Sequence, residues 1–153
     1  MSSEAVSTES RYLIYKIGAE TYGTPLLDVR EVVEYQKPKF MPNMEAYFVG
    51  VINVRGAIVG VVDMRLRFSQ NASQTKMPAL LICESDRGSI AAVVDQVEAV
   101  VSIPATDIEK NPPIVARVEP EYLLGVAKIQ ERLITLIDLK SSLTEMKVVQ
   151  KAA

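Results

Sequence analysis

The chain contains no histidine and no tryptophan, and it has a single cysteine among its 153 residues. Histidine is the side chain that changes charge near neutral pH. Its absence excludes histidine-based acid–base catalysis, histidine phosphotransfer and histidine ligation of metals. Cys83 cannot form an internal disulfide, and it directly follows the apolar run 79–82. A cysteine in that setting predicts a buried thiol within a strand rather than a reactive one.

Motifs that bind phosphates, dinucleotides or metals are also missing. The chain has no Gly-x-x-x-x-Gly-Lys loop, no Gly-x-Gly-x-x-Gly fingerprint and no pair of cysteines. A net charge of −2 gives no electrostatic footprint for nucleic acid. No apolar run approaches the length of about 18 residues that a membrane span needs, and residues 1–10 lack a signal peptide's apolar region. We therefore expect a cytoplasmic protein without cofactor, metal or nucleic-acid partner.

The clearest structural signal is a β-hairpin over residues 49–62. Two runs rich in valine and isoleucine, 49–54 and 57–62, are separated by Arg55 and Gly56. Branched side chains favour the pleated strand, and Gly56 supplies the positive φ that a tight turn needs. Apolar content predicts further extended segments at residues 12–17, 22–27, 79–83 and 89–101. Residues 28–33 form either a strand or a helical turn, and their β-branched content favours the strand.

The hairpin region recurs later in the chain. Residues 47–68 align without a gap on residues 122–143 at a shift of 75. The segment before the hairpin aligns at a shift of 67, so the second copy carries a loop eight residues longer. We interpret these matches as a true internal repeat. The matching polar and glycine positions are Gly50 with Gly125, Asp63 with Asp138, Asp28 with Asp95 and Glu31 with Glu98.

The repeat predicts an all-β fold of two units, over about residues 20–70 and 78–140. A unit of this size buries only about 60% of its unfolded surface and is marginally stable alone. Strands such as 91–94 are apolar on both faces, so the sister unit is expected to cover one face. We predict two small five-stranded barrels packed together, a short C-terminal helix within 140–151, and flexible tails at 1–10 and 146–153.

Distinctive motifs occur in the segments Tyr22–Val32, Gly50–Gly56, Val61–Arg65, Val93–Asp95 and Tyr122–Gly125. Together they resemble the CheW-like family, over roughly residues 11–145. The Asn-x-Arg-Gly hairpin is the most specific of them, and Gly60 departs from the family, which commonly has proline there. The resemblance implies one domain of two intertwined SH3-like barrels, with strand exchange between them.

The resemblance also implies a function. The stand-alone member of the family is a non-enzymatic adaptor that links the cytoplasmic tip of chemoreceptors to the regulatory domain of a histidine autokinase. The chain has no room for a fused kinase or receiver domain, so we expect the stand-alone adaptor. We expect a monomer in isolation, recruited to membrane-associated receptor arrays. Two alternatives stay open: an adaptor of another chemosensory pathway, and a small-molecule sensor or enzyme using Asp28, Asp63 and Asp95.

Receptor contacts are implied near Val29, Gly50 and the hairpin motif formed by Asn53, Arg55 and Gly56. Arginine offers five donors and a planar face, which suits protein interfaces. The sister hairpin has glutamine and glutamate at the matching turn, so an Arg-Gly turn is not needed for the fold. Arg55 is therefore either a partner-facing side chain or an arginine in solvent.

Kinase contacts are implied at Glu31 and Val32. The match of Glu31 with Glu98 weakens a special role for Glu31, so both readings stay open. Alternation places Val29 on the face of Leu27 and Glu31, which favours an interface over the core. Features present in both copies are better explained by the fold, and this gives structural roles to Asp63, Asp138 and Gly125.

Overall fold

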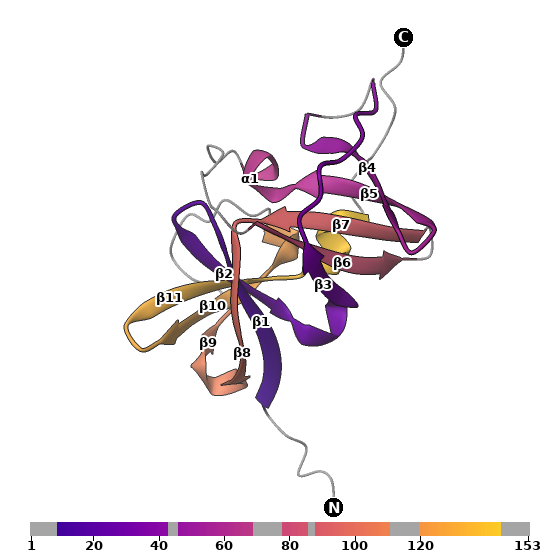
Figure 1. Cartoon of the computed structure of the whole chain (residues 1–153). Helices are drawn as coiled ribbons and strands as arrows, with labels where there is room; N and C mark the ends of the chain where they lie inside the picture. The colour runs from indigo at the N-terminus through magenta and orange to yellow at the C-terminus, as the bar shows by residue number, and fades with distance from the viewer. Residues whose placement is uncertain (1–8, 43–45, 69–77, 86–87, 111–119, 145–153) are drawn as a thin grey trace, which may run out of the picture.

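The computed structural model describes residues 9–42, 46–68, 78–85, 88–110 and 120–144 (Figure 1). Strands dominate these residues, and the helical segments are short. The strands are β1 (Glu9–Ile17), β2 (Glu20–Pro25), β3 (Glu31–Glu34), β4 (Phe48–Val54), β5 (Ala57–Asp63), β6 (Ala79–Ser85), β7 (Gly88–Val94), β8 (Gln96–Pro104), β9 (Ile108–Glu109), β10 (Leu123–Ile129) and β11 (Arg132–Ile137). The α-helices are α1 (Met64–Arg67) and α2 (Leu139–Thr144), and the 3-10 turns are η1 (Leu26–Asp28), η2 (Ala105–Asp107) and η3 (Pro120–Tyr122).

The strands form two mixed sheets, and each sheet takes strands from both halves of the chain. The six-stranded sheet has the order β8-β1-β2-β11-β10-β9, and the five-stranded sheet has the order β3-β6-β7-β5-β4. The repeat pairs β1 with β6, β2 with β7, β3 with β8, β4 with β10 and β5 with β11. Under that pairing the two orders are the same. The prediction of an all-β fold of two intertwined units with a C-terminal helix is confirmed.

Two details differ from the sequence-based expectation. One sheet has a sixth strand, β9, whose two residues pair with Val126 and Ala127 of β10. Its counterpart in the other sheet is a single bridge between Lys39 and Val51. The predicted helix begins at Leu139 and is described as far as residue 144. The rest of that prediction and both predicted tails lie outside the described residues, except for Glu9 and Ser10, which begin β1.

The predicted extended segments 22–27 and 89–101 were wrong in one respect, and so was the preference for a strand throughout 28–33, because a crossover between the sheets interrupts each of these regions. The chain leaves β2 at Pro25, turns through η1, and enters β3 in the other sheet. It leaves β7 at Val94, passes Asp95, and enters β8. Valine-rich composition gave no sign of these breaks, because the residues on both sides favour strands equally.

The main core lies between the two sheets. Leu13, Tyr15 and Tyr22 of the six-stranded sheet pack with Val62 and Leu81 of the five-stranded sheet in one buried cluster. Each fully buried aliphatic or aromatic side chain contributes about 1.5–3 kcal/mol relative to an exposed one. The core therefore holds the sheets together, as expected for strands that are apolar on both faces.

Cys83 belongs to the same cluster and has no exposed surface. Burial raises the pKa of its thiol to about 12. The thiol is therefore protonated at neutral pH and is inaccessible to reagents. The prediction of a buried, unreactive cysteine within a strand is confirmed by its place in β6.

Candidate functional site: the β4–β5 hairpin and the groove beside β3

The tip of the β4–β5 hairpin is a two-residue turn with positive φ at both central residues. Arg55 has φ 49° and Gly56 has φ 87°, as in the type I′ turns that suit twisted hairpins. The Asn53 side-chain oxygen accepts a hydrogen bond from the Gly56 backbone N–H at 2.9 Å. Asn53 and Gly56 therefore shape the turn, and the Arg55 side chain is left 65% exposed at the tip.

Arg55 forms an ion pair with Glu31 of β3. Its guanidinium donates a hydrogen bond to the Glu31 carboxylate. That hydrogen bond, with the charges of Arg55 and Arg30, lowers the pKa of Glu31. β3 and β4 are the two edge strands of the five-stranded sheet, so the pair joins one edge to the hairpin at the other edge. Arg55, predicted to contact the receptor, and Glu31, predicted to contact the kinase, are thus in direct contact with each other.

The sister sheet contains a similar pair. Arg132, at the start of β11, lies 2.7 Å from a Glu98 oxygen of β8, and Lys16 lies 3.7 Å from the same carboxylate. Glu98 is the repeat counterpart of Glu31, whereas Arg132 stands two places beyond the counterpart of Arg55. In both sheets, therefore, an arginine of the hairpin is bonded to a glutamate of the edge strand on the opposite side of the sheet. This pairing favours a structural contribution from Glu31.

Gly50 and Gly125 are both buried, and the backbone conformation at both positions requires glycine. Their φ angles are 140° and 147°, which other residues rarely adopt. A Cβ at Gly50 would lie 2.1 Å from the Lys39 carbonyl oxygen. A Cβ at Gly125 would lie 2.6 Å from a side-chain carbon of Ile108. Each glycine lets a neighbouring segment approach closely. Gly50 therefore shapes the hairpin base instead of presenting a surface.

The two valines of the predicted site differ in their surroundings. Val29 is partly buried against the core between the sheets, while Leu27 is 98% exposed. The prediction that these two share a face was wrong, because the 3-10 turn η1 breaks the strand alternation. Val32, on β3, is 43% exposed and borders a groove.

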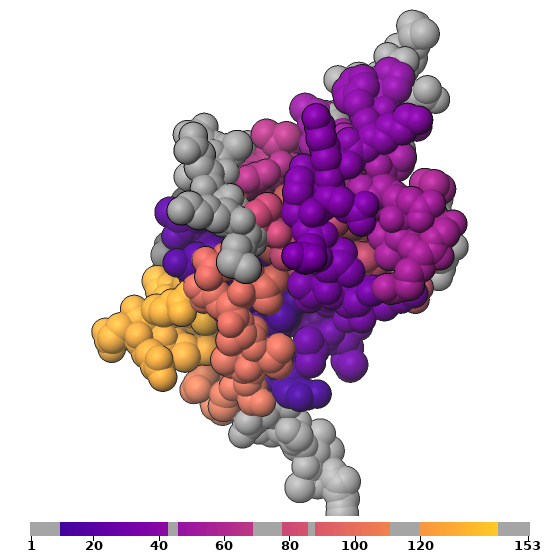
Figure 2. All heavy atoms as spheres, viewed as in Figure 1, coloured from indigo at the N-terminus to yellow at the C-terminus, as the bar shows by residue number. Residues whose placement is uncertain are grey.

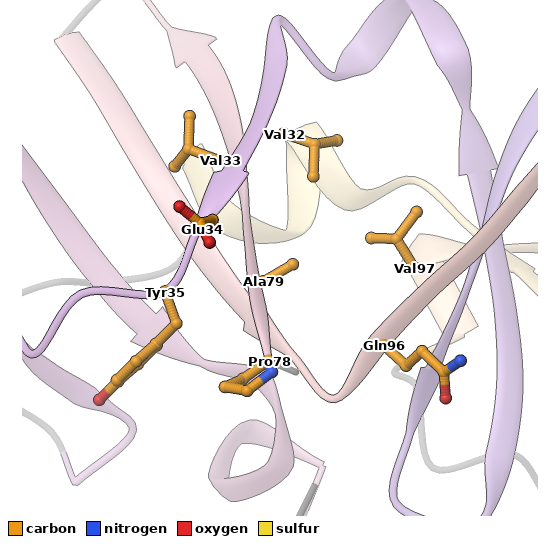
Figure 3. Close-up of a pocket in the computed structure, with 8 residues that line it drawn as sticks. All are labelled: Val32, Val33, Glu34, Tyr35, Pro78, Ala79, Gln96 and Val97. Atoms are coloured by element: carbon orange, nitrogen blue, oxygen red, sulfur yellow. The ribbon is translucent and has the colours of Figure 1, made fainter. Parts of the chain in front are cut away.

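This groove has a volume of about 750 Å³ and lies between strands of the two sheets (Figure 3). β3 provides one side, the start of β8 provides the other, and Ala79 of β6 lies between them. Figure 2 shows the β3 region and the β8 region side by side on one face of the molecule. The residues that line the groove are Val32, Val33, Glu34, Tyr35, Pro78, Ala79, Gln96 and Val97.

Sequence reasoning singled out only Val32 among the residues of this groove. The other side is formed by Gln96 and Val97, which are far from Val32 in the chain. They meet only because β3 and β8 follow the two crossovers between the sheets. No sequence motif marks Gln96 and Val97, and they could be predicted to line the groove only if the strand order of both sheets were already known.

Residues 11–147 match the family model described as the CheW-like domain. The chain belongs to the CheW-like family. A chemotaxis protein CheW of Klebsiella aerogenes is 31% identical over 156 residues, covering 100% of this chain and 93% of that protein. A chemotaxis protein CheW of Bacillus subtilis is 24% identical and covers 90% and 89% of the two chains.

A solved CheW-like structure matches the whole fold. The scaffolding protein TtCheW of Thermoanaerobacter tengcongensis superposes with a TM-score of 0.83 at 26% identity. The match covers 98% of this chain and 97% of that one. The family is one of scaffolding adaptors in chemotaxis signal transduction that catalyse no reaction.

The repeated aspartates of this CheW-like chain have structural partners. Asp63 accepts the Arg65 backbone N–H at 3.0 Å and begins α1, while Asp138 accepts the Ser141 N–H at 3.1 Å in α2. Each aspartate also donates its own N–H, over 2.8 Å, to the carbonyl of a tyrosine at the start of the preceding hairpin. Side-chain oxygens that bond the first N–H groups of a helix stabilise its start.

The carboxylates of the described residues do not gather into a metal centre. No group of three or more cysteine, aspartate or glutamate side chains there could hold a metal ion. Asp63 and Asp95, named above for the small-molecule alternative, both form ion pairs with Arg65. No helix in the same part of the chain has the length and apolar character needed to cross a membrane.

Proposed function

We propose that this chain couples the cytoplasmic tips of chemoreceptors to the histidine autokinase CheA, as a non-enzymatic adaptor of a chemotaxis pathway. Its membership in the CheW-like family supports the proposal. The observation that carries the proposal is that two surface features, an ion pair and a groove, adjoin each other along β3. The exposed Arg55–Glu31 pair lies at one end of β3, and the apolar groove runs beside that strand.

On the receptor side, Arg55 is the contact residue at the hairpin tip. Its guanidinium has donors beyond the bond to Glu31, so it can take a carboxylate or carbonyl of the receptor. Val29 supports β3 from the core side, and Gly50, Asn53 and Gly56 hold the hairpin in shape. The groove receives apolar side chains of the receptor, because such anchors dominate affinity at protein interfaces.

On the kinase side, Glu31 and Val32 are the proposed contacts with the regulatory domain. Both lie on β3, with Glu31 bonded to Arg55 and Val32 at the edge of the groove, so the two partners meet at this strand. A specific contact buries on the order of 1,000 Å² or more in total. One rigid body that holds both partners in a fixed geometry couples them without any chemistry of its own. The isolated chain is then a cytoplasmic monomer that its partners recruit to receptor arrays.

A three-component sedimentation experiment tests this proposal. Receptor cytoplasmic fragments attached to lipid vesicles are mixed with CheA, with and without the full chain, and the pelleted kinase is measured. We expect the amount of pelleted kinase to rise with the concentration of the chain until the receptor sites are filled. Kinase that pellets equally without the chain, or never pellets with it, would overturn the proposal.

A further inference from the structure

The two sides of the groove are the strands that follow the two crossovers. The chain crosses at Asp28 before β3, which carries the lining segment 32–35, and at Asp95 before β8, which carries Gln96 and Val97. The direction in which each strand leaves its crossover decides how far apart the two sides stand. Whatever holds these crossovers therefore sets the shape of the groove.

The second crossover is held by polar contacts to both sheets. Asp95 is buried, with a side chain only 5% exposed. Its carboxylate accepts the Gly18 N–H of the β1–β2 turn at 2.5 Å, and its own N–H donates to the Lys16 carbonyl at 2.9 Å. Arg65 approaches the same carboxylate from α1, with an N–O distance of 3.2 Å.

Arg65 reaches Asp95 from a fixed position. Its guanidinium binds Asp63 through two nitrogens, at 3.0 and 2.8 Å, and its side chain is 14% exposed. Paired N–H donors on one carboxylate constrain orientation as well as distance. Asp63 ends β5 of the five-stranded sheet, whereas Gly18 lies in the turn that joins β1 and β2 of the six-stranded sheet. The chain of contacts Asp63–Arg65–Asp95–Gly18 thus spans from one sheet to the other.

The first crossover has a weaker version of the same arrangement. The repeat places Lys140 at the position of Arg65 and Asp138 at the position of Asp63. The Asp28 carboxylate accepts the backbone N–H of Lys140 and lies within the influence of the Asp138 and Lys140 charges. Lysine is a point charge on a flexible stem and cannot form the planar fork of arginine. The Asp95 crossover is therefore the one with a rigid side-chain bridge.

We propose that Arg65 is a positioning residue for the groove. By bridging Asp63 and Asp95, it fixes the direction of β8 relative to the five-stranded sheet and so sets the spacing between β3 and β8. This inference rests on the proposed function only in taking the receptor as the molecule that occupies the groove. Arg65 itself is not one of the residues that line the groove, so its effect on binding is indirect.

The spacing can be measured in solution with spin labels on the two sheets. Cysteines are introduced at two exposed positions, Gln36→Cys just after β3 and Ser102→Cys on β8. The buried Cys83 takes no label. Distance distributions are recorded by electron–electron double resonance for the otherwise unchanged chain and for Arg65→Lys and Arg65→Gln. Arg11→Gln, which removes an exposed arginine of β1, is the matched control.

The same variants, without labels, are titrated with a receptor fragment by calorimetry. We expect Arg65→Gln to broaden or shift the distance distribution in fully folded protein and to lower receptor affinity about tenfold, since loosely held binding surfaces lose preorganisation. Arg65→Lys should give a distance distribution and a receptor affinity between those of Arg65→Gln and the unchanged chain, because lysine still reaches one carboxylate. Arg11→Gln should match the unchanged chain in both measurements. Circular dichroism confirms that each variant is folded.

The two measurements separate the possible failures. An unchanged distance distribution in folded Arg65→Gln overturns the positioning role, whatever the affinity does. A changed distribution with unchanged receptor affinity also overturns it, because the groove would then tolerate the movement. If the unchanged chain does not bind the receptor fragment, the proposed function fails, and the distance distributions still decide whether Arg65 sets the spacing. If Arg65→Gln is unfolded, Arg65→Lys and Asp95→Asn carry the same two measurements.

Discussion

Arg55 donates a hydrogen bond to the Glu31 carboxylate, and this pair joins the hairpin tip to the edge strand β3. Both side chains stand at the surface, with 65% and 23% of their area exposed. A partner that binds Arg55 through a carboxylate must compete with Glu31 for the same donors. The proposed receptor and kinase contacts are therefore dependent on one another, and variants at either residue need controls that separate fold from contact.

Replacing Arg55 should change the titration of Glu31. The hydrogen bond from Arg55 is the largest cause of the lowered Glu31 pKa, so Arg55→Gln should raise that pKa towards its ordinary value of 4.5. Because the pKa of Glu31 is lowered by folding, the pair stabilises the fold fully at pH values above the ordinary pKa. This stabilisation is lost as the pH falls through the lowered pKa. Side-chain carboxyl NMR titration measures the shift. Arg132→Gln in the sister hairpin should leave the Glu31 pKa unchanged, and an unmoved pKa in Arg55→Gln would show that the pair is absent in solution.

Reversing charges should separate a contact role from a structural one. We expect Arg55→Glu to weaken receptor binding about tenfold and Glu31→Lys to weaken kinase-domain binding by a similar factor, because each substitution reverses a charge at the proposed contact. Both variants should stay folded, since exposed ion pairs contribute little to stability. Arg132→Glu is the matched control, and calorimetry measures the affinities. The double variant Arg55→Glu with Glu31→Arg rebuilds the pair in reverse. If it restores both affinities, the residues act only by shaping the surface.

Alanine at the two hairpin glycines should have different effects. Gly56→Ala meets no atom within 4 Å, so its cost comes from the positive φ and should be about 1–2 kcal/mol. Gly50→Ala adds a direct overlap with the Lys39 carbonyl, and we expect it to cost more than about 3 kcal/mol. Urea unfolding followed by circular dichroism measures both values. Equal losses would mean that the close approach at Gly50 is relaxed in solution.

Asp28 should make the fold less stable as pH rises. Burial, followed by the neighbouring Asp138 charge, raises the pKa of Asp28 above its ordinary value of 3.8. The folded chain then binds this proton more readily than the unfolded chain, so the free energy of unfolding decreases as the pH rises through this window. Asp28→Asn removes that decrease and keeps an oxygen acceptor for the Lys140 N–H. The stability of the variant relative to the unchanged chain should therefore increase as the pH rises above 3.8. A difference that stays constant with pH would contradict the prediction.

The strands and their repeat were predictable because local composition determines them. The run of valines around Arg55-Gly56, and its copy around Gln130-Glu131, predict hairpins that the structure contains. The crossovers at Asp28 and Asp95 were not predictable in this way. Each lies inside a segment of strand-favouring residues, and the sheet that the next strand joins depends on packing across the whole chain.

The site was predictable only in part. Family resemblance pointed to Arg55 and Glu31, but their ion pair depends on the five-stranded sheet bringing its edges together, which no local pattern encodes. Val32 was singled out without the groove that it borders, since Gln96 and Val97 reach it only through the second crossover. Gly50 and Asn53 were expected to contact a partner, and their surroundings give them roles in backbone geometry.

The exchange of strands between the sheets has a consequence for folding. β1 and β2 complete a sheet whose other strands are made later in the chain, and β6 and β7 complete the sheet begun by the first half. Neither half contains a whole sheet, so we expect neither half to fold as an autonomous fragment. We therefore expect the two sheets to melt together in one cooperative step. Folding should be complete only after β11, the last strand of the described residues, has joined its sheet.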